Sequence, residues 1–141
     1  MKHISLTVGF WLACALPTHA EIIASCGPSA GYSYFYEADL HDAEGWEEAR
    51  ITGTTIFTRS GDDLDVIIQS TVNDENWTRS ASDYGAPVAV VNEAGDALHI
   101  IVVWDSATEL YALDLKRKMF SVVSHKAGVI DVTHALVGPC E

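Results

Sequence analysis

Short β-rich runs alternate with turn-forming clusters along most of this chain. Val, Ile, Thr and aromatic residues gather in the runs, whereas Gly, Asp, Ser and Asn gather between them. Runs that recur about every ten residues, with no long helical period, are typical of an antiparallel all-β domain. The expected strands are 32–36, 51–59, 64–69, 77–81, 87–92, 98–104, 109–115, 119–125 and 129–137.

The gaps between these runs are too short for the crossovers that parallel strands need. The pattern therefore predicts an antiparallel meander of about 7–9 short strands. Such a meander either closes into a barrel or folds into a two-sheet sandwich, and both alternatives stay open. The run 98–104 is almost wholly apolar, which favours a central strand covered on both faces, with His99 buried inside it. We also expect Trp46 and Trp104 in the core, because a small β-domain needs large side chains there.

The first twenty residues have the pattern of a secretory signal peptide. A short basic start, Met1-Lys2-His3, leads into an apolar run over 4–16 and a small-residue exit that ends at Ala20. The apolar run is too short to span a bilayer, and no second long apolar run follows it. We therefore expect a signal peptide over 1–20, a single exported β-domain over 21–141, and no membrane span.

Removal of the signal peptide takes Cys14 with it and leaves two cysteines, Cys26 and Cys140, at opposite ends of the mature chain. Thiols oxidise outside the cytoplasm, so an even pair predicts a disulfide. The ends of a domain often lie close together. We therefore expect a single Cys26–Cys140 bond that ties the two ends.

The composition is strongly acidic. The chain has 8 basic and 20 acidic residues and a formal net charge of −12. Loss of residues 1–20 removes Lys2 and no acidic residue, so the mature domain has a net charge near −13. Such a surface disfavours nucleic acid and anionic lipid, and favours a basic protein or cationic peptide. The same acidity also serves simply to keep an exported protein soluble.

Several short motifs resemble a group of small exported proteins of unknown function from alphaproteobacteria. These are Cys-Gly-Pro-Ser-Ala-Gly-Tyr-Ser-Tyr-Phe over 26–35, Gly-Trp-Glu over 45–47 with Ile51 after it, the segment 61–68, and a terminal Cys140. The resemblance covers most of the mature chain. It implies a periplasmic or secreted bacterial domain and brings no catalytic residue with it.

The acidic segment 37–48 is the main candidate for an interaction surface. Carboxylates crowd around Trp46, which gives the densest negative charge beside an aromatic side chain. These groups would steer a basic partner towards the segment. A divalent cation is an alternative ligand, although no ligand spacing is diagnostic and an acidic run is usually a solvated loop. The candidate partner-binding residues are Glu37, Asp39, Asp42, Glu44, Trp46 and Glu48.

The sequence contains no recognisable catalytic, cofactor or metal motif. The histidines and serines of the mature chain match no known sequence motif of a catalytic nucleophile, such as a nucleophile elbow. A disulfide between the two cysteines would leave no reactive thiol. We therefore expect a non-enzymatic binding module for a basic envelope or secreted protein. Two alternatives stay open: a hollow β-barrel that binds a small apolar or sugar ligand, and a small hydrolase. The sequence does not indicate an oligomeric state.

Overall fold

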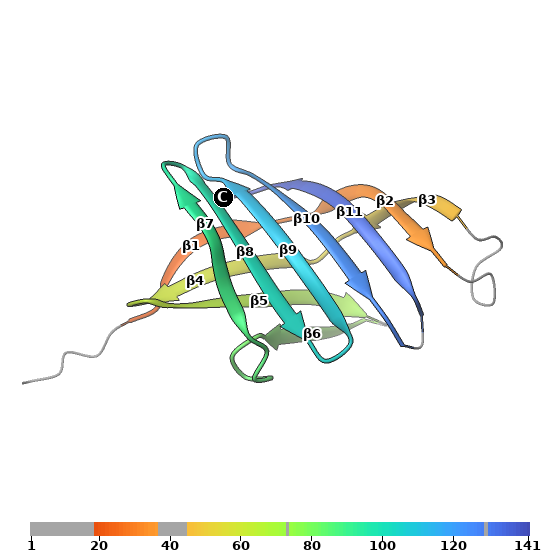
Figure 1. Ribbon diagram of the computed structural model, residues 1–141, viewed down its shortest axis with the longest axis horizontal. Coiled ribbons are helices and arrows are strands. Elements are labelled where there is room, and N and C mark those ends of the chain that lie inside the picture. The colour runs from red at the N-terminus through yellow and green to blue at the C-terminus, as the bar shows by residue number, and fades with distance from the viewer. Residues whose placement is uncertain (1–18, 37–44, 73, 129) are drawn as a thin grey trace, which may run out of the picture.

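The computed structural model describes residues 19–36, 45–72, 74–128 and 130–141 (Figure 1). This part of the chain is all-β, as predicted, and contains eleven strands and no helix. None of its segments forms a helix long and apolar enough to cross a membrane. The strands are β1 (Glu21–Cys26), β2 (Ser29–Phe35), β3 (Gly45–Ile51), β4 (Thr54–Ser60), β5 (Asp63–Val72), β6 (Glu75–Ser80), β7 (Val88–Ala94), β8 (Ala97–Trp104), β9 (Ala107–Asp114), β10 (Met119–Lys126) and β11 (Val132–Pro139).

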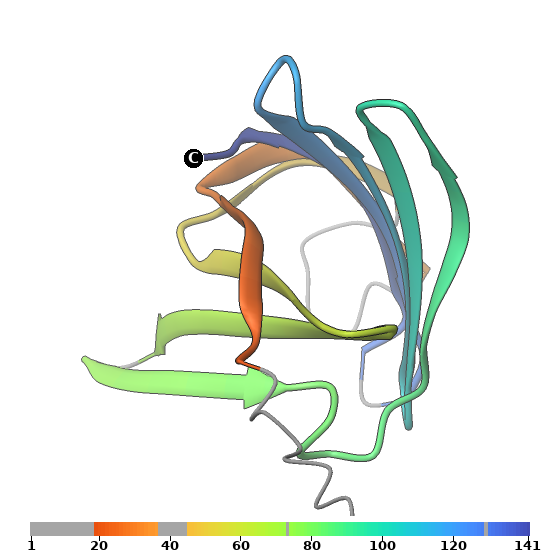
Figure 2. The same cartoon turned by 90° about the vertical axis from the view of Figure 1, so that its left-hand side faces the viewer.

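The strands form two antiparallel sheets. One has four strands in the order β1-β4-β5-β6, and the other has seven in the order β3-β2-β11-β10-β9-β8-β7. The seven-stranded sheet is strongly curved, and the four-stranded sheet lies across its concave side (Figure 2). The sheets are not closed into a barrel, so the sandwich alternative holds.

One long bent hairpin joins the two sheets. β1 pairs with β4 in the first sheet, and β2 pairs with β3 in the second, in nearly the same register throughout. Both arms therefore cross from sheet to sheet at the same level, through Gly27-Pro28 in one arm and Thr52-Gly53 in the other. A side chain on Gly27 would collide with the carbonyl oxygen of Gly53. The close approach of the two arms at this corner therefore requires glycine.

The predicted disulfide is confirmed at this corner. Cys26 ends β1 and is bonded to Cys140, which follows β11. The two residues also form an isolated antiparallel bridge, and Glu141 exchanges two backbone hydrogen bonds with Ser25. The C-terminal end of the chain is thereby held against the first strand.

The strand Ala97–Trp104 alternates between two environments, which corrects the expectation of burial on both faces. Leu98, Ile100, Val102 and Trp104 face the core and are at most 4% exposed. Val103, on the outer face, is 44% exposed. His99 is half-buried on that outer face, opposite Asn92 of β7 and Ala112 of β9. In the described part of the chain no further layer covers the outer face of this sheet, so apolar residues such as Val103 stay partly exposed there.

Two strands escaped the sequence pattern, which is why the number exceeds the expected 7–9. β1 follows directly after the expected signal peptide, and β3 carries Trp-Glu-Glu-Ala-Arg with no apolar alternation. Both are recruited by pairing with strands that the pattern did predict. Backbone pairing thus overrides weak local propensity in these two segments.

Candidate functional site

A cavity of about 330 Å³ lies between the two sheets. Its lining comes from β4, β5 and β6 of the small sheet and, in the large one, from β8 to β11 and from Ser29 of β2 and Ile51 of β3. Cavities of roughly 300–1,000 Å³ are typical of small-molecule sites, so this one lies at the lower end of that range.

The cavity arises where the inward side chains of the curved sheet change from large and apolar to polar. Cross-strand register places these residues in rows across β8, β9, β10 and β11. All three rows contribute to the lining, and the third supplies Glu109, Ser124 and His134, whereas Leu98, Leu113, Ile100 and Val102 are buried in the core and do not line the cavity. The rows are Leu98, Leu113 and Phe120; then Ile100, Tyr111, Val122 and Leu136; then Val102, Glu109, Ser124 and His134.

The opposite wall changes in the same way. Phe57 and Val66 are completely buried in the small sheet, and the Phe57 ring packs edge-on against Tyr111, with centroids 5.2 Å apart. The following row includes Ile68 and Arg79, and beyond it Ser70 pairs with Trp77. The cavity therefore has its floor at Tyr111, which Phe57 supports from the core, and polar and aromatic walls above it.

Glu109 is the central charged group of the site. It is 8% exposed, and its Oε2 atom accepts two hydrogen bonds of 2.7 Å, from the indole Nε1 of Trp104 and the hydroxyl of Tyr111. Among the described residues, the other carboxylate oxygen, Oε1, has no hydrogen-bond partner. Two rigid aromatic donors thus fix the carboxylate and leave one oxygen available to a bound molecule.

Tyr111 is suited to this role as a permanent donor. Burial, reinforced by the negative charge of Glu109, raises the pKa of Tyr111 well above its ordinary value. The phenol therefore stays protonated at neutral pH, and its O–H remains available to Glu109.

Arg79 forms part of the opposite wall. Its guanidinium lies over the Trp104 ring, 3.7 Å from the centroid, and 5.0 Å from the centroid of Tyr84. It forms no ion pair with Glu109 or with any other acidic residue that the structure describes. Its Nε atom is buried and has no hydrogen-bond partner within residues 19–36, 45–72, 74–128 and 130–141. A buried donor without a partner is uncommon in folded proteins.

Asp65 holds the segment that follows Arg79. Its carboxylate accepts hydrogen bonds from the hydroxyls of Ser80 and Ser82, at 2.7 and 2.8 Å, and from the backbone of Ser82. Burial alone would raise the pKa of Asp65, but these hydrogen bonds lower it overall. An ionised Asp65 thereby fixes the end of β6 and the turn that carries Tyr84.

His134 and Ser33 share a hydrogen bond of 2.6 Å on neighbouring strands. This pair does not have the geometry of a catalytic dyad, because Ser33 is 2% exposed and does not line the cavity. A nucleophile must reach its substrate. Ser33 instead fixes the orientation of the His134 ring, which does line the cavity.

The buried position of His134 predicts a pH dependence of stability. Burial, together with the positive charge of Lys126, lowers its pKa from the ordinary 6.5. Below pH 6.5, His134 takes up a proton in the unfolded chain more readily than in the folded protein. The free energy of unfolding should therefore fall as the pH decreases from about 6.5. Urea unfolding of wild type and His134→Gln between about pH 7.5 and 5 should show a weaker pH dependence in the variant. His125→Gln, on the outer face, is the control. If both variants lost the same amount of pH dependence, the assignment of that dependence to His134 would be wrong.

The sequence-predicted partner segment lies apart from this cavity. Glu37, Asp39, Asp42 and Glu44 are outside the described residues, so their role as a partner surface stays a prediction. Trp46 is 62% exposed, which corrects its expected place in the core, whereas Trp104 is buried as predicted. Glu48 is exposed beside it on β3.

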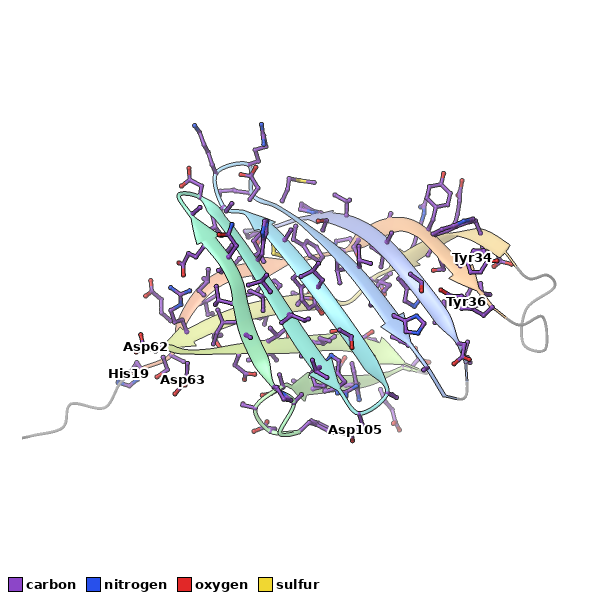
Figure 3. All side chains as sticks on the ribbon, viewed as in Figure 1. His19, Tyr34, Tyr36, Asp62, Asp63 and Asp105 are labelled. Carbon is purple, nitrogen blue, oxygen red and sulfur yellow. A yellow bond between two sulfur atoms is a disulfide. The ribbon has the colours of Figure 1, made fainter. Side chains whose placement is uncertain are left out.

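Trp46 belongs to an aromatic group on the outer face of the large sheet. Its ring lies edge-on to Tyr34 at 5.4 Å, and Tyr34 in turn contacts Tyr36 at 5.0 Å. Figure 3 shows Tyr34 and Tyr36 side by side at the end of β2. None of these three side chains lines the cavity.

The described part of the chain contains no group of three His, Cys, Asp or Glu side chains arranged to hold a metal ion. Comparison with known proteins gives no further assignment: no family model, no curated protein and no solved structure matches this chain. The geometry of the cavity is therefore the basis for a functional proposal.

Proposed function

We propose that this protein is a non-enzymatic binding protein for a small polar molecule, held in the cavity between its two sheets. The observation that carries the proposal is the fixed carboxylate of Glu109 in the cavity lining, one oxygen of which has no partner among the residues that the structure describes. A few oriented polar groups on largely apolar and aromatic walls are the usual composition of such sites.

The size of the cavity limits the ligand. About 330 Å³ suits a molecule of the size of a monosaccharide, an amino acid or a small organic acid. Trp77 is 39% exposed and also lines the cavity, so its ring can cover one side of the ligand. Aromatic rings pack well on the flat faces of sugars and other rings.

We favour the small-ligand alternative over the basic-protein partner, with the ligand between two open sheets rather than inside the closed barrel that this alternative had assumed. The carboxylates that favour a basic partner lie mostly in 37–44, outside the described residues. The side chains that line the cavity all belong to the described part of the chain. Export to the periplasm or the medium, as the first twenty residues and the disulfide suggest, suits a protein that captures a solute outside the cytoplasm.

Blocking the cavity tests the proposal. Ser124 lies between Glu109 and His134 in the third row and is 5% exposed. Ser124→Phe should fill the cavity without the usual 1–3 kcal/mol cost of overpacking, because the ring has space to occupy. A panel of sugars, amino acids and organic acids should include compounds that raise the melting temperature of wild type. At ten times Kd, binding adds about 1.4 kcal/mol, or about 5 °C in a domain of this size.

Ser121→Phe is the matched control, since it places the same side chain on the outer face of the same strand. Ligands of the cavity should shift the melting temperature of wild type and Ser121→Phe but not that of Ser124→Phe. Equal shifts in all three proteins would place binding elsewhere, and the absence of any shift in wild type would contradict the proposed function.

A further inference from the structure

The cavity has a different charge balance from the rest of the protein. Two of the seven Lys and Arg residues of the mature chain, Arg79 and Lys126, line it. Four of the twenty acidic residues fall in 37–44; of the sixteen that the structure describes, only Glu109 lines the cavity. Cationic groups are therefore concentrated in the cavity of a strongly acidic protein.

Arg79 is arranged to bind an acceptor. Its guanidinium carbon lies over the Trp104 ring, and a cation–π contact of this kind does not use up the N–H donors, which remain able to bond an acceptor. The described residues provide it with no carboxylate. Arg117, by contrast, contacts Asp114 at 2.8 Å, and Arg59 binds Glu93 through both terminal nitrogens at 3.0–3.1 Å. Arg79 differs from the other arginines in that its buried Nε has no hydrogen-bond partner among the described residues and its side chain lines the cavity, so an anionic ligand there would supply the missing acceptor.

Glu109 places a second requirement on the ligand. The free oxygen of its carboxylate accepts a hydrogen bond and repels another anion, so the part of the ligand that it meets must carry a donor. Trp104 connects the two groups, because it donates to Glu109 and supports Arg79 on its ring. The site therefore offers a cationic donor over the face of one indole and an anionic acceptor at its Nε1 edge.

We infer that the ligand is a small organic acid that also carries a hydroxyl or amino group, with its carboxylate on Arg79 and its donor on Glu109. Uronic acids, hydroxy acids and amino acids belong to this class. The inference rests on the proposed function and narrows it from any small polar molecule to an anionic one.

The acidic surface does not prevent this. At an ionic strength of about 0.15 M, charges more than about 8 Å apart are largely screened, whereas Arg79 would act on the ligand at contact. A bidentate pair of guanidinium and carboxylate is also among the strongest hydrogen-bonded pairs in proteins. The local cations thus outweigh the distant carboxylates.

Matched pairs of acids and neutral analogues test the inference by calorimetry. We suggest D-glucuronate with D-glucose, D-galacturonate with D-galactose, and L-phenylalanine with L-phenylalaninol. At least one acid should bind wild type ten-fold or more tightly than its analogue. Arg79→Gln should remove that preference, and Arg79→Lys, which keeps the charge but loses the planar fork, should reduce it. Arg50→Gln, an exposed site on β3, is the control for the loss of one positive charge.

The outcomes separate the two proposals. If neutral analogues bind as tightly as the acids, or if folded Arg79→Gln and Arg79→Lys retain the preference, the anionic ligand is wrong, although the cavity still binds. If no acid and no analogue binds wild type, both proposals fail. Loss of the preference in Arg50→Gln as well would assign it to overall charge rather than to Arg79.

Discussion

Replacement of both Cys26 and Cys140 by alanine should lower the free energy of unfolding by about 4–5 kcal/mol. The bond closes a loop across a sequence separation of 114 residues. In the chain-entropy model, a cross-link that closes a loop of this length lowers the entropy of the unfolded chain and so raises its free energy by about 4–5 kcal/mol. A loss of this size is a large fraction of the stability of a small domain and should bring it close to unfolding at 37 °C.

Urea unfolding of the double variant and of wild type, with and without dithiothreitol, measures the effect. Reduced wild type should match the double variant, because both lack the cross-link. Thiol titration of the unfolded, unreduced protein should detect no free thiol in the mature chain. If the free energy of unfolding of the double variant lay within about 1 kcal/mol of that of oxidised wild type, the disulfide would not restrict the conformations of the unfolded chain as the model requires.

The disulfide also bears on the cavity. Cys26 lies opposite Thr55 of β4, Thr55 opposite Ile68 of β5, and Ile68 opposite Arg79 of β6. One end of this cross-strand row is therefore anchored to the C-terminal end of the chain, and the other end presents Arg79 to the cavity. We expect ligand affinity, as well as stability, to depend on the oxidised bond.

Strands β8, β9 and β10 of the large sheet were predictable because their inward residues alternate with outward ones. Trp104 follows Leu98, Ile100 and Val102 in phase, and all four are buried. Trp46 stands between Gly45 and two glutamates and has no such phase, so its exposure follows the local pattern rather than the general preference of tryptophan for cores. The position of a tryptophan in the apolar alternation of its strand therefore predicts its burial better here than its residue type does.

The same phase contains the signal for Glu109. Tyr111 and Leu113 face the core, and Glu109 precedes them at the same alternation, so a carboxylate on the buried face could be recognised from the sequence. Arg79 could not be recognised in this way. Its importance depends on the packing of an edge strand of one sheet against Trp104 of the other, and no local pattern encodes that contact.

Glu109→Ala should lower the free energy of unfolding by about 3 kcal/mol and abolish ligand binding. The change leaves the buried Trp104 N–H and Tyr111 O–H without their acceptor, and a buried donor without a partner costs about 1–3 kcal/mol. Glu109→Gln retains a carbonyl oxygen for the two donors and should cost only about 1 kcal/mol. Urea unfolding of both variants measures these losses.

A double-mutant cycle with Tyr111→Phe distinguishes lost hydrogen bonds from lost packing. In the Tyr111→Phe background, one of the two donors that Glu109→Ala would leave without an acceptor is already absent. Glu109→Ala should therefore cost about 1 kcal/mol less than it does in wild type. The same cost in both backgrounds would mean that the Tyr111 bond contributes nothing, and the carboxylate would then be fixed by Trp104 alone. A carboxylate held by one donor could rotate, and the fixed oxygen that the proposed binding site requires would be lost.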